Sequence, residues 1–375
     1  MSDPITLVGD PDGTEHVLCR VAGVECRVNG TLPASLRPAL DGLMAESSPG
    51  GGVPDAADSS SSPSDGSGVV EAARDMPSVS AASWRRRFEP YRIPEWSGVD
   101  AAPVRAVVGR DMFVSIMRRL ARDAGPAAGP DSSTAVRARI GIARDECLRR
   151  TMLAGLPRKR VLAVYGVCVA YDNRAYLFSG QGAGDALLPE SYALQWRRWL
   201  GDGVRIIGDG WLALGVGKHG RERFAAVSPT PWNRREGWFH GVTAPLDAWC
   251  FIRAGNDGVC ETRHVDPAEA TDDELRNVFM PNDRIGAIAA LDLLNQILQL
   301  TPTYTMALAR AMADARLGDA GAVDGDAVNG GVAVIDDAAA ETAARTGFEA
   351  LTGMRYADRR ALFAPPLTSI ATAWG

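Results

Sequence analysis

Lysine and histidine are scarce in this chain of 375 residues. Its only lysines are Lys159 and Lys218, so arginine carries nearly all of the positive charge, and the four histidines show no spacing typical of a metal site or a catalytic triad. The net charge of −6 provides no basic footprint, so nucleic acid and anionic membranes are not expected partners. A phosphate-binding motif that requires a lysine could therefore use only one of these two residues.

Cysteine pairs and long apolar runs are also missing. None of the six cysteines forms a CxxC pair, which argues against a zinc knuckle or a disulfide framework. The chain opens on MSDPIT, without the basic and apolar regions of an export signal, and no apolar run reaches membrane-spanning length. We therefore expect a cytoplasmic protein whose cysteines are reduced and mostly buried.

Composition divides the chain into unequal parts. Apolar residues make up 46% of the whole, enough for a substantial core, but residues 46–82 consist mainly of serine, glycine, proline and aspartate. Such a segment buries too little apolar surface to offset the entropy lost on ordering. We predict a β-rich N-terminal module at 1–45, a disordered linker at 46–82, a connecting α+β segment at 83–157, a main domain at 158–353 with a loop insertion at about 317–336, and a tail at 354–375.

Hydrophobic patterning predicts strands and helices that together form an α/β fold. The expected strands lie at 5–8, 15–21, 24–28, 161–170, 204–214, 223–227, 247–253 and 259–264. The expected helices lie at 135–156, 189–200, 267–315 and 337–351. The third of these helices is inferred from helical spacing of Ile285, Ile288, Leu291, Leu294, Ile297 and Leu298.

A glycine-rich turn separates an apolar strand from the helix at 189–200, which is the layout of a phosphate-binding P-loop. The turn consists of Gly180, Gln181, Gly182, Ala183, Gly184 and Asp185. A P-loop requires Lys and then Ser or Thr after its last glycine, whereas this chain has Asp185 and Ala186, with no basic residue between Gly180 and Arg197. A carboxylate at that position repels phosphate oxygens. The turn is equally consistent with a tight connection kept for packing.

Several blocks of the main domain resemble the HPr kinase/phosphorylase-like family, which is related to phosphoenolpyruvate carboxykinase. The blocks are YLFSG at 176–180, LQWRRWLGD at 194–202, RIIGD at 205–209, SPTPW at 228–232 and APLDAWCFI at 244–252. The blocks follow one another in the order and spacing of the family, and the resemblance covers roughly half of the chain. The resemblance implies a P-loop kinase-like mixed sheet flanked by helices, with a helical C-terminus, and an ATP-dependent serine kinase that uses Mg²⁺.

Three departures from the family pattern affect positions that the resemblance makes catalytic. The family's loop lysine is replaced at Asp185, its histidine-glycine pair becomes Tyr165-Gly166, and its Asn-Asp-Asp strand end becomes Gly208-Asp209-Gly210. Tyr165, Asp185 and Gly210 are therefore degenerate positions, while Asp209 could still hold a metal ion or cap a turn. Three independent losses indicate that catalysis is gone.

Three functions remain open at this stage. The first is a pseudokinase that binds a protein or peptide partner without transferring phosphate. The second is an active ATP-dependent serine or peptide kinase in which Lys218, Arg197 or Arg198 reaches the phosphates. The third is an anion or nucleotide sensor, because the backbone N–H groups of residues 180–185 can bind an anion without the lysine. Relatives of the family form oligomers, so the resemblance also allows a homo-oligomer.

Overall fold

The computed structural model describes residues 7–9, 15–22, 24–29, 103–124, 133–180, 188–219, 221–233, 243–255, 261–266, 275–308 and 337–355. The predicted linker at 46–82, the insertion at 317–336, most of the tail and residues 181–187 of the glycine loop lie outside these ranges. Among the described residues, no helix is both long and apolar enough to cross a membrane.

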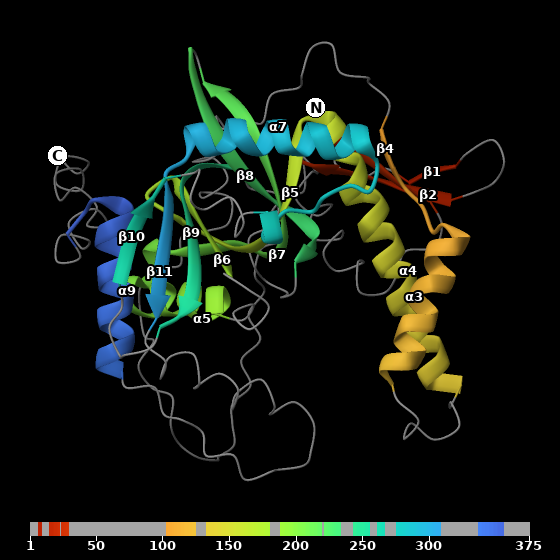
Figure 1. Cartoon of the computed structure of the whole chain (residues 1–375), viewed down its shortest axis with the longest axis horizontal. Coiled ribbons are helices and arrows are strands. Elements are labelled where there is room, and N and C mark those ends of the chain that lie inside the picture. The colour runs from red at the N-terminus through yellow and green to blue at the C-terminus, as the bar shows by residue number, and fades with distance from the viewer. Residues whose placement is uncertain are drawn as a thin grey trace, which may run out of the picture.

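The main body is a mixed α/β structure built on a seven-stranded, mostly antiparallel sheet with the order β10-β11-β9-β6-β5-β7-β8 (Figure 1). The parallel pairings in this sheet are those of β6 with β9 and of β9 with β11. A short pairing of β8 with β9 also links two strands that are not neighbours in this order. The strands are β5 (Val161–Tyr171), β6 (Arg174–Gly180), β7 (Arg205–His219), β8 (Glu222–Asn233), β9 (Ala244–Ala254), β10 (Glu261–Val265) and β11 (Thr303–Leu308).

Helices cover both faces of this sheet. The helix α7 (Arg284–Leu300) packs on one face, over a core that includes Leu162, Leu212 and Phe251. The helices α5 (Leu188–Leu200) and α9 (Asp337–Thr352) pack on the other face. Strand β5 is buried on both sides, which explains its almost continuous apolar sequence.

The N-terminal strands form a second sheet with the order β1-β2-β3-β4. Its strands are β1 (Leu7–Gly9), β2 (Glu15–Val21), β3 (Val24–Asn29) and β4 (Val104–Ala106). The helices α3 (Arg110–Asp123) and α4 (Ser133–Gly155) follow as a pair on the side of the molecule opposite α9 in Figure 1. Two short 3₁₀ helices, η1 (Pro157–Lys159) and η3 (Gly201–Gly203), precede β5 and β7. One apolar cluster joins Cys26, Leu148 and Ala213, so the small sheet, α4 and the main sheet share a core.

The patterning predicted most of these elements. The helices expected at 135–156, 189–200 and 337–351 correspond to α4, α5 and α9 within two residues at each end. The hairpin between β5 and β6 turns at Asp172 and Asn173, which adopt positive φ angles of 45° and 62°. Cys26, Cys147, Cys168 and Cys250 are buried free thiols, as expected.

The prediction of one long helix at 267–315 is wrong. The helix α7 spans Arg284–Leu300, and the chain then enters β11, which pairs in parallel with β9. Of the six apolar side chains that suggested the helix, Leu294, Ile297 and Leu298 are buried. The other three, Ile285, Ile288 and Leu291, are exposed.

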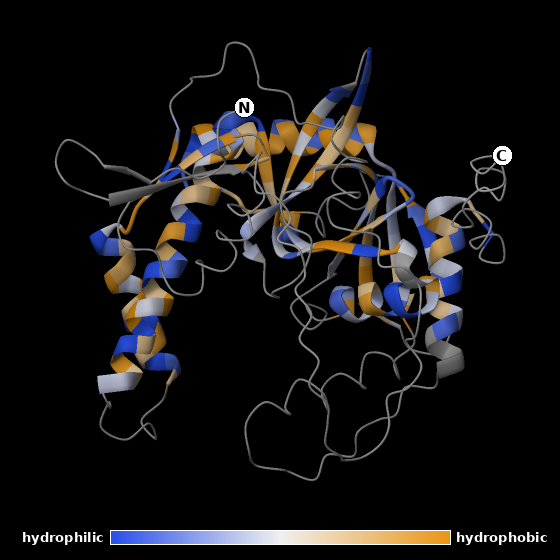
Figure 2. Cartoon of the chain, turned by 180° about the vertical axis from the view of Figure 1, so that it is seen from behind, coloured by the Kyte–Doolittle hydropathy of each residue, from blue (hydrophilic) through white to orange (hydrophobic). Residues whose placement is uncertain are grey.

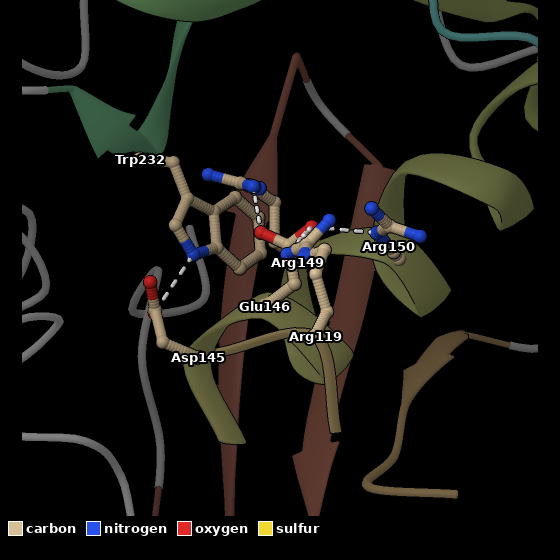
Figure 3. Close-up of polar contacts among 6 residues, drawn as sticks. All are labelled: Arg119, Asp145, Glu146, Arg149, Arg150 and Trp232. Carbon is tan, nitrogen blue, oxygen red and sulfur yellow. Dashed lines mark hydrogen bonds and ion pairs between the residues drawn. The ribbon is translucent and has the colours of Figure 1, made fainter. Parts of the chain in front are cut away.

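A polar cluster connects α4 with the helix before it and with the main sheet (Figure 3). Glu146 accepts from Arg149 and from Arg150 Nε at 2.6 Å, and Arg119 lies 3.8 Å from the same carboxylate. Next to it, the indole nitrogen of Trp232 on β8 donates to Asp145 at 3.1 Å. Burial raises the pKa of Asp145, although the hydrogen bond from Trp232 and the charge of Arg149 oppose the rise.

Replacing Asp145 by asparagine should remove a pH dependence of stability without losing the acceptor for Trp232. The raised pKa of Asp145 means that the folded state holds this proton more readily than the unfolded state. Protonated Asp145 therefore contributes to folding stability below the ordinary aspartate pKa. This contribution is lost as pH rises through the raised pKa. Urea unfolding should show Asp145→Asn as stable as the wild type or more so at pH 7.

That advantage of Asp145→Asn should shrink when the same titration is repeated toward pH 4. The control is Asp145→Ala, which leaves the Trp232 indole N–H without its acceptor and should cost about 1–3 kcal/mol at pH 7. Equal losses for Asn and Ala at pH 7 would show that the hydrogen bond to Trp232 contributes nothing.

Candidate functional site

The glycine loop leaves the sheet where three parallel strands end. Gly180, the last residue of β6, lies opposite Ile252 of β9, which in turn lies opposite Met306 of β11. The carboxyl ends of β6, β9 and β11 therefore meet at one edge, and α5 begins on the far side of the loop at Leu188. Ligands of open α/β sheets commonly bind outside the carboxyl ends of parallel strands.

The register brings together the described positions that the sequence singled out. Tyr165 on β5 lies opposite Trp211 on β7, and Gly166 lies opposite Gly210. Asp209 lies opposite Val167, which is itself paired with Phe178 of β6. These positions and Gly180 thus occupy three adjacent strands next to the start of the loop. Gln181, Gly182, Ala183, Gly184 and Asp185 lie outside the described residues.

Asp209 is not at a strand end, contrary to the sequence prediction. The strand β7 continues to His219, and Asp209 is 1% exposed in its interior. Register shifts on β7 occur on both sides of this residue, and Gly210 has a φ of 88°. Because that φ favours glycine, a carboxylate residue at position 210 would be strained. No group of three or more potential metal ligands occurs among the described residues.

Gly166 allows β5 and β6 to approach closely beside the loop. A β-carbon at this position would lie 2.5 Å from the Phe178 carbonyl oxygen and 2.8 Å from the Ser179 hydroxyl. Backbone atoms in a paired strand cannot move aside easily. The glycine of the Tyr165-Gly166 pair therefore has a packing reason that is independent of catalysis.

Two polar side chains hold the end of β6, and sequence reasoning missed both. The fully buried hydroxyl of Ser179 donates to the Tyr165 carbonyl at 2.9 Å and accepts from the Trp249 indole nitrogen at 3.0 Å. The amide nitrogen of Asn277 donates to the Gly180 carbonyl at 2.9 Å. Together they fix the last peptide before the glycine loop to β5, to β9 and to the segment before α7. No local pattern around Asn277 marks this contact, because it spans 97 residues.

Replacing Asn277 by alanine should destabilise the anchored end of β6. Asn277 is 7% exposed, so its removal leaves the Gly180 carbonyl without this donor in a place that water reaches poorly. We expect a loss of about 1–3 kcal/mol in the free energy of unfolding. Chemical denaturation measures it, with Asn295→Ala on the exposed face of α7 as the matched control. Equal stability of Asn277→Ala and the control would contradict the anchoring role.

Three aromatic rings from β5, β7 and the segment before α7 pack in a row. The rings of Tyr165 and Trp211 meet edge to face at 5.3 Å, and Trp211 meets Phe279 in the same way at 5.6 Å. The segment that carries Phe279 is held to β5 by a backbone hydrogen bond from Phe279 to Ala163 at 2.9 Å. All three rings are half-buried, so they form a partly accessible apolar wall at the position where the resemblance expects a histidine.

Arginines line a polar pocket at the same edge of the sheet. The pocket holds about 260 Å³ and is lined by Arg253, Glu261, Arg263, Thr305 and Ala307. Arg253 directly follows Ile252, the partner of Gly180, and Ala307 lies opposite both Arg253 and Glu261. The pocket is therefore at the carboxyl ends of β9 and β11. Two guanidinium groups there can form charge-assisted hydrogen bonds with an anion, although Glu261 partly offsets their charge.

The three basic residues considered as substitutes for the lysine lie elsewhere. Arg197 and Arg198 are in the last turn of α5. At a rise of about 1.5 Å per residue, this turn is roughly 14 Å from the end of the helix that faces the loop. Arg198 stacks on Trp199, with the guanidinium carbon 5.0 Å from the ring centre. Lys218 is exposed near the far end of β7, about 23 Å along the strand from Trp211 at 3.3 Å per residue.

Comparison with known proteins adds no further assignment. No protein-family model matches the chain, and no curated protein matches it.

Proposed function

We propose that this chain is a catalytically degenerate, HPr-kinase-like protein that acts as a binding or regulatory partner. Its ligand is an anionic group of a protein or peptide, bound at the edge where β6, β9 and β11 end. The observation that carries the proposal is the position of the arginine pocket. Gly180 lies opposite Ile252, and the next residue of β9, Arg253, lines the pocket.

Binding without transfer follows from the chemistry of the residues available. Phosphoryl transfer depends on positive charge and metal ions placed around the transferred group. This chain has Asp185 where that charge belongs, and Arg197, Arg198 and Lys218 are distant from the start of the loop. A bound anion, in contrast, needs only donors, which Arg253 and Arg263 supply.

Inorganic phosphate tests the binding site directly. Isothermal calorimetry should detect weak binding to the wild type with no dependence on magnesium. Arg253→Ala should weaken it about tenfold, which corresponds to 1.4 kcal/mol and is typical of one charge-assisted hydrogen bond. Asp185→Asn should tighten it, because the substitution removes a like charge near the anion.

The matched control is Arg118→Ala, which removes an exposed arginine from α3 and should leave phosphate binding unchanged. Equal affinities for the Arg253 and Arg118 variants would place the anion elsewhere on the molecule. If neither Arg253→Ala nor Asp185→Asn changes the affinity, the proposed binding edge is wrong.

A further inference from the structure

The helix α7 presents apolar side chains on its outer face as well as its inner face. Its inner side chains, including Leu293, Leu294 and Ile297, pack on the main sheet. On the outer face, Ile285 is 70% exposed, Ile288 is 57% exposed and Leu291 is 46% exposed. Figure 2 shows the helix at the upper edge of the molecule, coloured largely as hydrophobic. Three large apolar side chains on one exposed helical stripe form a surface of the kind that binds another protein.

Charged residues flank this stripe in a symmetric order. Arg284 precedes Ile285, and Asp292 follows Leu291, so the outer face reads basic, apolar, apolar, apolar, acidic. Ile288 is the midpoint, four residues from each charge and three from each flanking apolar side chain. Each charge is therefore about 6 Å from Ile288 along the helix axis, at a rise of about 1.5 Å per residue.

This order is complementary to itself when two copies of the helix are antiparallel. A two-fold axis beside Ile288 brings Ile288 next to its copy and places Ile285 at the level of Leu291 of the other chain. The same axis places Arg284 of each chain at the level of Asp292 of the other chain, so the interface contains two such pairs. A parallel arrangement would instead bring like charges to the same level, which is unfavourable. Symmetric pairing of one patch with itself is the usual form of a two-fold interface.

We infer that α7 is the contact surface of an antiparallel homodimer in which the two-fold axis passes beside Ile288. Both charged residues are available at the surface. Arg284 is exposed, and Asp292 keeps 58% of its side chain exposed although Arg160 approaches it to 3.8 Å and Gln296 donates to it at 2.8 Å. Because the stripe spans only two turns of helix, the dimer should be weak and should form as protein concentration rises.

Sedimentation of the full chain over a range of concentrations tests this inference. The wild type should show a monomer–dimer equilibrium, and Ile288→Glu should weaken dimerisation at least tenfold because the change places two carboxylates on the axis. Ile142→Glu is the control, since Ile142 on α4 is also exposed at 54% and lies outside the stripe. A wild type that remains monomeric at every concentration, or an unaffected dimer in Ile288→Glu, would overturn the inference.

Charge exchange tests the antiparallel arrangement. Arg284→Glu should weaken the dimer by placing Glu opposite Asp292, and Asp292→Arg should weaken it by placing Arg opposite Arg284. The double variant Arg284→Glu/Asp292→Arg should recover most of the affinity, because each level again holds opposite charges. Thermal melts of each variant establish that the chain remains folded. If the double variant dimerises no better than the single variants, the antiparallel arrangement is wrong.

Discussion

Replacing Trp196 by alanine should destabilise the chain by about 3–5 kcal/mol, the range for deletion of a large buried aromatic side chain. Trp196 is fully buried in α5, where its ring lies 5.4 Å from Tyr176, 5.3 Å from Phe178 and 5.7 Å from Phe348. Its removal would leave a cavity between α5, β6 and α9. Since these elements share one apolar cluster, the whole α5 face should loosen.

The matched control is Trp199→Ala, three residues along the same helix. Trp199 is only half-buried, so its loss should cost less, about 1–2 kcal/mol. Denaturant unfolding of both variants gives the comparison. Equal losses for Trp196 and Trp199 would contradict the packing described for α5.

Gly347→Ala should also be strongly destabilising, by about 1–3 kcal/mol or more, because it overpacks the contact between α9 and α5. A β-carbon at position 347 would lie 1.7 Å from the Tyr192 hydroxyl oxygen and 2.6 Å from Met306. Tyr192 is fully buried and donates to the Ala343 carbonyl at 3.1 Å, so its ring has little freedom to move. Alanine stabilises a helix by about 1 kcal/mol relative to glycine. The overpacking at position 347 must therefore cost more than this for the variant to be destabilised.

Two variants separate overpacking from other effects. Gly141→Ala in α4 meets no atom within 4 Å and should therefore stabilise the chain by about 0.5–1 kcal/mol. Tyr192→Phe removes the clashing oxygen, so the cost of Gly347→Ala should be smaller in that background. Stabilisation by Gly347→Ala, measured by thermal unfolding, would show that α9 does not pack against α5 in this way.

The sequence predicted the elements whose patterns are local. The strand β5 is apolar at nearly every position because both of its faces are buried, and α5 carries its buried Tyr192 and Trp196 at helical spacing. The structure places Tyr165, Asp209 and Gly180 on neighbouring strands. Local patterning therefore predicted elements of the fold, whereas the assignment of a site to these positions stays a prediction.

Features set by distant contacts were not predictable in this way. The strand β11 was assigned to a helix because only six residues form it and its parallel partner β9 lies about 50 residues earlier. The helix α7 is apolar on two faces, so its periodicity could not show which face is buried. The shifts on both sides of Asp209 and the contact of Asn277 with Gly180 likewise depend on pairing between remote segments.

Calorimetry of ATP binding, with and without Mg²⁺, tests the central claim most directly. The account predicts that the purified wild-type chain binds ATP weakly, that magnesium does not strengthen this binding, and that Arg253→Ala reduces it. Binding through arginines at the edge of β6, β9 and β11 has this signature, since it requires no metal. Tight ATP binding that depends on magnesium and is unaffected by Arg253→Ala would contradict the account and favour an active kinase.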